Sequence, residues 1–126
     1  IVTPFKAQMR AVEKQLLKQC PDLMKKGTRM TVGTVHALQG AERKIVIFSP
    51  TYGKGHTGGV YFDQSPNMLN VAVSRAQDSF LVIGNLALFD AGQRNRPSGL
   101  LASHLFHGEG SAPLTNIFSD LIDSAP

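Results

Sequence analysis

The stretch that decides the fold is Asn-Val-Ala-Val-Ser-Arg-Ala-Gln-Asp-Ser-Phe-Leu-Val-Ile-Gly, residues 70–84. Around its first half, apolar residues recur at about 100° per residue, so one arc of a helix carries Met68, Leu69, Ala72, Val73 and Ala76. The second half, residues 80–83, is a short apolar run closed by Gly84, which predicts a buried strand. Arg75 lies at the boundary of the apolar arc, on a helix that leads directly into a core strand. A fixed arginine of this kind suits phosphate binding, although a surface arginine on an amphipathic helix explains the same pattern.

Three further strands are predicted on the N-terminal side of this stretch. Residues 44–48 contain the unbroken run Ile-Val-Ile-Phe, residues 30–35 are rich in β-branched side chains, and residues 1–3 read as the end of a strand. A run without alternation is typical of a strand covered on both faces, hence of a parallel sheet with helices on either side. Apolar residues at helical spacing predict a helix that begins near Phe5 and ends before Pro21. We therefore expect an α/β fold with a mainly parallel sheet flanked by helices.

The remaining segments are expected to be loops and short helices. Residues 36–40 are too short for more than a turn, and residues 52–66, rich in Gly and Pro, predict a mobile surface loop. Beyond the last strand we expect a short helix at 86–91, a helix capped by Ser98, and an amphipathic helix at 114–122. Residues 1–3 begin without a preceding turn, so we expect a single domain, residues 1–126, truncated at its N-terminus within a larger protein.

Composition bounds the class of protein. With 42% hydrophobic and 17% charged residues, the chain is typical of a globular fold and not of disorder. No apolar run approaches the ~20 residues that span a bilayer, and no signal peptide is recognisable, so we expect a cytoplasmic protein without a membrane partner. The single Cys20 permits no internal disulfide and predicts a buried thiol. His104 and His107 lie three apart on a predicted helix but lack a third ligand, so no metal site is predicted.

Positive charge is concentrated at the N-terminal end. The net charge is +4, and residues 1–29 carry seven Lys or Arg against Glu13 and Asp22. On the first predicted helix, every fourth residue is basic; we call this set the basic stripe: Lys6, Arg10, Lys14 and Lys18. The stripe fits contact with a phosphate backbone, and it equally fits a solvated helix face.

Residues 34–42 carry the polar groups that could bind a ligand. They lie between two predicted parallel strands, and in open α/β sheets ligands bind at the carboxyl ends of strands. Gly40 allows the backbone to approach a ligand closely, and Gln39, Glu42 and His36 supply hydrogen-bonding groups. Taken singly, His36 fits a satisfied loop histidine and Glu42 a solvated charge.

Three segments taken together resemble superfamily 1 helicases. Residues 3–8, Thr-Pro-Phe-Lys-Ala-Gln, are similar to the Thr-Pro-Tyr-x-x-Gln element of that family. Residues 34–49 resemble its motif V through Gln39-Gly40 and Glu42, and Asn-Val-Ala-Val-Ser-Arg-Ala (residues 70–76) resembles its motif VI. The segments occur in the family's order across residues 1–85, and they are most similar to the branch that contains the nonsense-mediated-decay RNA helicase. Residues after 85 resemble no family.

The resemblance implies the second RecA-like motor domain of an ATP-driven translocase, a three-layer fold of the P-loop NTPase type. Arg75 would be the arginine finger, which reaches the γ-phosphate of ATP bound between two such domains. Gln39, Gly40 and Glu42 would border the ATP, with Glu42 near the ribose.

The resemblance also implies contacts with single-stranded DNA or RNA. The residues near the strand would be Thr3, Pro4, Phe5, Thr34 and His36, where contacts to phosphates carry affinity without sequence information. Asn70 and Ser74 would hold the arginine helix in register. Phe5 replaces the family's tyrosine and so keeps the ring without the hydroxyl. Two simpler interpretations stay open: Asn70 caps its helix, and Phe5 belongs to the core.

Two elements of the family are absent from the sequence. There is no Gly-x-x-x-x-Gly-Lys-Ser/Thr loop and no Asp-Glu pair after an apolar strand, the elements that bind phosphates and Mg²⁺ in the family's first domain. We therefore expect ATP and Mg²⁺ as cofactors of the full-length protein, none bound by this chain alone, and no ATP hydrolysis without the first RecA-like domain as partner. The alternative is a non-catalytic module that binds nucleic acid or a protein, against which the retained Arg75 argues.

Overall fold

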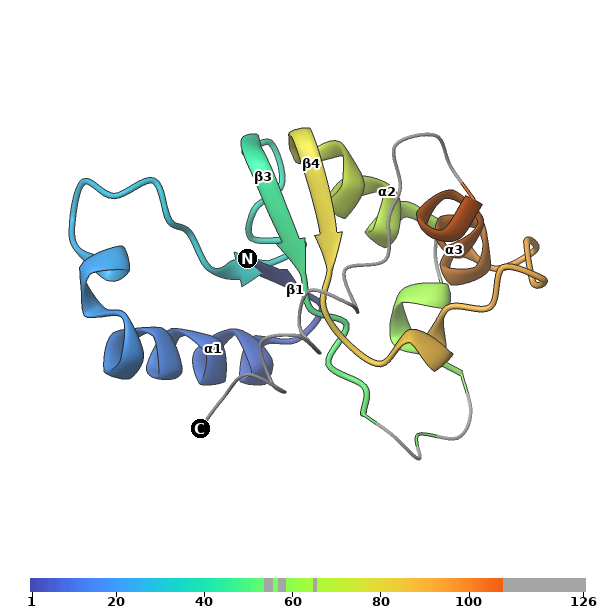
Figure 1. Cartoon of the computed structure of the whole chain (residues 1–126), viewed down its shortest axis with the longest axis horizontal. Helices are drawn as coiled ribbons and strands as arrows, with labels where there is room; N and C mark the ends of the chain where they lie inside the picture. The colour runs from blue at the N-terminus through green and yellow to red at the C-terminus, as the bar shows by residue number, and fades with distance from the viewer. Residues whose placement is uncertain (54–55, 57–58, 65, 108–126) are drawn as a thin grey trace, which may run out of the picture. The chain divides into compact units, whose positions relative to one another are not determined.

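A computed structural model describes residues 1–53, 56, 59–64 and 66–107 (Figure 1). The chain divides into two compact units, residues 1–88 and 89–126, and each is described by itself. The expectation of one domain over residues 1–126 stays a prediction.

The first unit is built on a sheet of four strands: β1 (Val2–Thr3), β2 (Gly33–Thr34), β3 (Arg43–Phe48) and β4 (Ala76–Val82). Their order across the sheet is β2-β1-β3-β4, and every neighbouring pair is parallel. β3 and β4 pair along their whole length and form the largest part of the sheet (Figure 1). The parallel sheet confirms the predicted α/β class with a RecA-like arrangement.

Two α-helices accompany this sheet. α1 (Lys6–Gln19) follows β1 and contacts β1 and β2, whereas α2 (Pro66–Ser74) precedes β4 and contacts β3 and β4. Single 3₁₀ turns are η1 (Pro21–Met24), η2 (Tyr61–Asp63) and η3 (Leu86–Leu88). α1 lies between Pro4 and Pro21 as predicted, because proline is tolerated outside a helix or in its first turn but not in its interior.

The two helices lie on opposite faces of the sheet. The Phe48 ring contacts Phe62 in η2, at a centroid distance of 5.8 Å, on the face that α2 covers. The next residue, Ser49, is on the other face, where its hydroxyl lies 3.4 Å from Nε2 of Gln8 in α1. Right-handed crossovers require this arrangement, because the connection from β1 to β2 and the one from β3 to β4 run in opposite directions across the sheet.

The core of this unit lies between the sheet and α2. Its buried side chains come from β3, η2 and α2: Val46, Phe48, Phe62, Met68, Leu69 and Ala72. On the opposite face, Ile45 is 59% exposed and Ile83 is 52% exposed. The prediction that the apolar runs at 44–48 and 80–83 are buried was therefore wrong for Ile45 and Ile83, because α1 packs mainly against β1 and β2.

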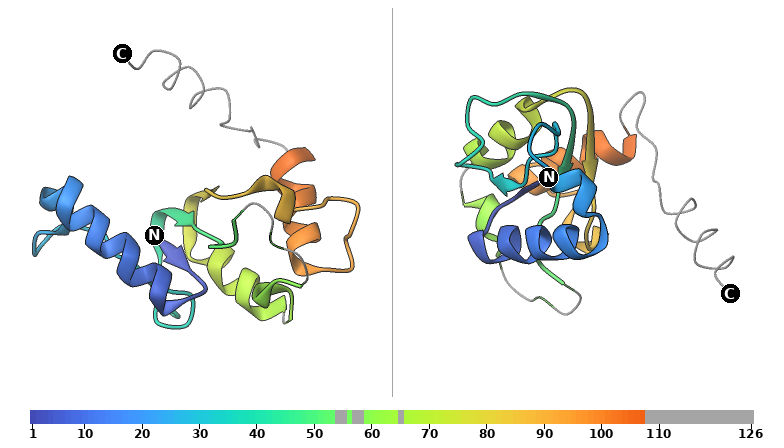
Figure 2. Two further views of the ribbon diagram at one scale, coloured as in Figure 1. Left: turned by 90° about the horizontal axis from the view of Figure 1, so that it is seen from below. Right: turned by 90° about the vertical axis from the view of Figure 1, so that its left-hand side faces the viewer.

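α1 projects past the two short strands that it covers (Figures 1 and 2). None of its residues is buried, and Cys20 at its end is exposed. The predicted buried thiol was wrong because the helix extends beyond the sheet that would have covered it.

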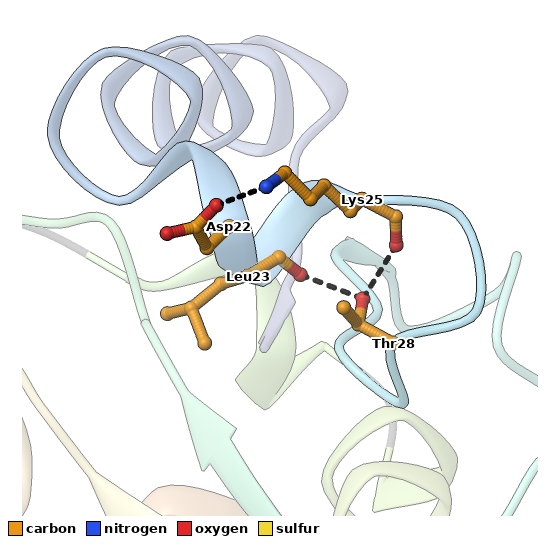
Figure 3. A network of polar contacts seen from close by, with 4 residues as sticks. All are labelled: Asp22, Leu23, Lys25 and Thr28. Carbon is orange, nitrogen blue, oxygen red and sulfur yellow. Dashed lines mark hydrogen bonds and ion pairs between the residues drawn. The ribbon is translucent and has the colours of Figure 1, made fainter.

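Local polar contacts stabilise the segment between α1 and β2 (Figure 3). Thr28 Oγ1 lies 2.7 Å from the carbonyl oxygen of Leu23 and 2.9 Å from that of Lys25, and the Lys25 ammonium pairs with the Asp22 carboxylate. The strand predicted at 30–35 is reduced to Gly33–Thr34, the two residues that pair in register with Val2 and Thr3 of β1.

The predicted loop at 52–66 is partly anchored in the core. Val60 and Phe62 are buried, so a mobile surface loop is wrong for these two residues. Residues 54–55, 57–58 and 65 of the predicted loop lie outside the described part of the chain.

The described part of the second unit contains α3 (Pro97–His107). Ser98 was predicted to cap this helix, but the helix begins one residue earlier, with proline in its first turn, and Ser98 is buried. Gly99 is required here, because a Cβ atom at this position would lie 2.0 Å from the carbonyl oxygen of Gln93. The helix predicted at 114–122 lies outside the described residues.

Candidate functional site

Arg75 is the single residue between α2 and β4. The prediction placed it on the helix, but the helix ends at Ser74, and the Arg75 backbone carbonyl already accepts a hydrogen bond from the Arg43 N–H at 2.9 Å. Its side chain folds back on the last helical turn: Nε donates to the Val71 carbonyl at 3.1 Å and Nη2 donates to the Ser74 hydroxyl at 3.0 Å. These contacts orient a half-buried guanidinium whose Nη1 has no hydrogen-bond partner within the described ranges.

Glu42 lies beside Arg75 in the sheet, because Arg43 pairs with Ala76 in the β3–β4 register. The Glu42 carboxylate is exposed and accepts a hydrogen bond from Nε2 of Gln77 at 2.9 Å. Sequence reasoning missed Gln77, since Glu42 and Gln77 are 35 residues apart and only the strand register brings them together.

Arg43 was also missed as part of this region. Its guanidinium donates to the Glu42 carbonyl at 2.8 Å and to the Thr31 hydroxyl at 3.1 Å. A cavity of about 30 Å³ is lined by both arginines together with Val46 and Leu38.

Gln39 and Gly40 lie in the turn that connects β2 to β3, and both are exposed. Gly40 has a φ of +86°, a conformation that a residue with a Cβ adopts only with strain. The turn begins compactly, because the Thr34 hydroxyl accepts the Ala37 N–H at 3.2 Å and Leu38 covers Gly33, where a Cβ would lie 2.7 Å from the Leu38 side chain.

The sequence placed residues 34–42, Glu42 among them, near the carboxyl ends of the strands, but Glu42 lies directly before β3, at the amino ends. Glu42 and Arg75 directly precede β3 and β4, and together with Arg43 and Gln77 near the starts of these strands they form what we call the amino edge of the sheet: Glu42, Arg43, Arg75 and Gln77. The prediction was wrong because the turn at 35–40 carries the chain from the carboxyl end of β2 back to the amino end of β3.

The predicted nucleic-acid contacts lie at the opposite end of the strands, which we call the carboxyl edge. Thr3 and Thr34 end β1 and β2, are paired in register and are both buried, and Pro4 beside them is buried as well. The Thr3 hydroxyl lies 3.1 Å from the Thr51 hydroxyl. Thr51 has a φ of +80°, which is rare for a β-branched residue.

Phe5 and His36 differ in their surroundings. Phe5 is half-buried in an aromatic cluster with Tyr52 and Tyr61, so it is neither a core residue nor fully solvated. His36 is exposed in the turn, and its carbonyl accepts the Gln39 N–H at 3.3 Å.

Asn70 and Ser74, the predicted supporting residues, are both exposed. Ser74 receives the Arg75 guanidinium, whereas the Asn70 side chain makes no hydrogen bond to the part of the chain that the structure covers. Asn70 lies in the middle of α2, so the alternative that it caps the helix was wrong.

All four residues of the basic stripe are exposed, and none of them forms an ion pair with a described residue. Among the residues described, no three His, Cys, Asp or Glu side chains are grouped to hold a metal ion, and no helix has the length and apolar character to cross a bilayer.

Comparison with known proteins adds to this geometry. A family model described as "AAA domain" matches residues 1–87. The DNA polymerase alpha-associated DNA helicase A of Schizosaccharomyces pombe is 35% identical over 68% of the chain, and helicase sen1 of the same organism is 32% identical over 68%. A Dictyostelium discoideum protein named as a probable helicase is 28% identical over 91% of the chain. The chain spans only 12%, 5% and 11%, respectively, of these relatives.

Proposed function

The chain belongs to the AAA-domain family, as a helicase-like domain of superfamily 1, and from this membership we propose that it is the second motor domain of an ATP-driven helicase. In this proposal it supplies the arginine finger and part of the track for single-stranded nucleic acid. A first RecA-like domain of the same protein supplies the phosphate-binding loop.

The observation that carries the proposal is the placement of Arg75 beside Glu42 at the amino edge. An arginine finger needs a guanidinium that is held in direction yet retains free donors, because it stabilises charge that develops on the transferred phosphoryl group. The Arg75 side chain is held by Val71 and Ser74 through Nε and Nη2, which leaves Nη1 to donate. The exposed carboxylate of Glu42, directly before the adjacent strand β3, suits the hydroxyl groups of a ribose.

The donor set of the chain fits ATP better than it fits the metal ion. Two arginines and a carboxylate meet at the amino edge, but the described residues offer no cluster of acidic ligands for Mg²⁺. Mg²⁺ neutralises phosphate charge in such reactions, and we propose that residues of the first domain hold it. This chain by itself would then not hydrolyse ATP.

The nucleic-acid contacts are proposed for the carboxyl edge, where Thr3 and Thr34 end their strands. Two exposed positive charges, Lys6 and Arg10, follow on the first turns of α1. Contacts of this type bind phosphates without reading bases, as a translocating motor requires.

The test is ATP hydrolysis by the longer protein that we propose contains this chain, compared with the chain alone, with and without single-stranded oligonucleotides. We expect turnover in the longer protein only, and stimulation of that turnover by the oligonucleotide. A longer protein that is silent while the chain still binds oligonucleotides would instead establish the non-catalytic module.

A further inference from the structure

An aromatic cluster at the carboxyl edge is not used by the ATP chemistry. We call it the aromatic edge and define it by the rings of Phe5, Tyr52, Tyr61 and Phe62; the His56 ring also lies against Tyr52, at a centroid distance of 4.3 Å. The Phe5 ring lies 5.8 Å from Tyr52 and 5.5 Å from Tyr61, and Tyr52 lies 5.9 Å from Phe62, all between ring centroids. Both tyrosines of the chain belong to this cluster.

Burial increases steadily across the cluster. Phe62 is completely buried against Phe48, Phe5 and Tyr52 are half-buried, and Tyr61 is 40% exposed. The buried ring of Phe62 thus anchors the cluster in the core, while the rings of Phe5, Tyr52 and Tyr61 keep part of their surface exposed to solvent. Apolar ring surface held open in this way can bind a flat ligand by stacking.

The outer rings are held in place before any ligand binds. The Tyr52 hydroxyl accepts a hydrogen bond from the backbone N–H of Tyr61 at 2.8 Å. This bond connects the start of η2 to the segment that follows β3. Thr51, directly before Tyr52, keeps its strained φ of +80° while its hydroxyl contacts that of buried Thr3. Strain of this kind costs about 1–3 kcal/mol and persists where surrounding structure enforces it, often at binding sites. A rigid platform loses little entropy on binding.

The position of the cluster in the sheet also favours a ligand site. The chain crosses from β1 to β2 in one direction and from β2 back over β1 to β3 in the other, so the strand order reverses between β1 and β3. Ligands of open α/β sheets bind outside the carboxyl ends of strands at this switch point. Phe5 follows β1 and Tyr52 follows β3, so the aromatic edge stands there.

Charge next to the rings indicates the class of ligand. Lys6 directly follows Phe5, Arg10 lies one helical turn later, and both are exposed. Exposed rings beside exposed cations match a polyanion with flat bases, because bases stack on aromatic rings while cations contact the backbone.

We propose that the aromatic edge is a stacking platform for the bases of single-stranded nucleic acid, with Tyr61 and Phe5 as the stacking rings and Tyr52 as the residue that positions Tyr61. This proposal rests on the proposed function and deepens it, because it adds two tyrosines and a base contact to a track otherwise made of backbone contacts. A base held by stacking is bound whatever its identity, since every base has a π-face.

The first test is photocrosslinking of the longer protein to a 12-nucleotide oligo-dT that carries 5-iodouracil, followed by mapping of the crosslinked peptide. Halogenated bases crosslink efficiently to rings on which they stack, so we expect crosslinks at Tyr61 or Phe5. Crosslinks that map only elsewhere overturn the proposal.

The second test compares two substitutions of one residue. Tyr61→Phe keeps the ring, and Tyr61→Leu keeps an apolar side chain without the ring. We expect Tyr61→Leu to weaken oligo-dT or oligo-rU binding about tenfold and Tyr61→Phe to stay within about twofold of the wild type. Equal affinity of the two variants overturns stacking and leaves an apolar contact, such as one with a protein segment.

The two proposals fail in different ways. If the aromatic edge is not a platform, Tyr61→Leu leaves binding unchanged while ATP turnover still depends on nucleic acid. If the motor proposal fails, the wild-type protein shows no turnover at all, with or without an oligonucleotide.

Discussion

The two ends of the strands in the first unit differ in polarity and in burial. The amino edge is polar and accessible: the carboxylate of Glu42 and the amide of Gln77 are exposed and bonded to each other, and Arg75 is held by the end of α2. The carboxyl edge is packed: Thr3 and Thr34 are buried, and rings beside them continue into the core.

This difference follows from the parallel sheet. All four strands point the same way, so one edge collects the residues that precede strands and the other collects those that follow them. Under the proposed function, the separate edges would keep phosphate chemistry apart from nucleic-acid contact. The turn at 35–40 runs from one edge to the other, since it starts after Thr34 and ends shortly before Glu42.

The largest effect is expected from Arg75→Ala in the longer protein. Loss of an arginine finger lowers turnover by ~10³-fold or more, while ATP affinity stays close to that of the wild type. Steady-state hydrolysis and nucleotide-analogue binding measure the two quantities. Arg94→Ala, which removes an exposed arginine of the second unit, is the matched control. If turnover of Arg75→Ala stays within a few-fold of the wild type, the amino edge does not perform the phosphate chemistry.

An intermediate effect is expected from the basic stripe, split into two halves. Lys6→Ala with Arg10→Ala removes the charges nearest the carboxyl edge, and Lys14→Ala with Lys18→Ala removes those farther along α1. Each phosphate contact contributes about 0.7 to the slope of log affinity against log salt for single strands, so the first pair should reduce the slope by about 1.4. We expect a smaller change for the second pair. Equal changes for both pairs would show that the strand follows the whole helix and not the carboxyl edge.

The smallest effect is expected from Gln77→Ala. If Glu42 contacts the ribose in the ground state and the transition state alike, loss of its hydrogen-bond partner raises KM for ATP roughly threefold to tenfold and leaves kcat within about twofold. Gln77→Glu should raise KM further, because it places a second carboxylate beside Glu42. The melting temperature should stay unchanged, since both side chains are exposed. A fall in kcat at constant KM would instead connect Gln77 to Arg75.

Much of the local structure could be predicted because the signals are local. Pro4 and Pro21 bound α1, and the run at 44–48 marks β3, since chain stiffness and apolar periodicity act within a few residues. Exposure was predicted less well. An apolar strand such as β3 does not show whether a helix covers its second face, so Ile45 was expected to be buried and is not.

The candidate site likewise contains residues that local sequence signals identified and residues that only the structure brought to notice. Arg75, Glu42 and Phe5 were recognised from the residues around them, because each belongs to a short motif. Gln77 and Tyr61 belong to no motif, and their partners are far away in the sequence.

The sequence by itself determined the parallel α/β class, the extents of α1 and β3, and the residues that could bind phosphate, because these depend on spacing along the chain. Only the tertiary structure decided that Glu42 and Arg75 share the amino edge, that Gln77 holds Glu42, and that Phe5 joins two tyrosines at the other end. The physical reason is that strand register and crossover direction place residues from distant parts of the chain side by side, and no periodicity in the sequence encodes which of them meet.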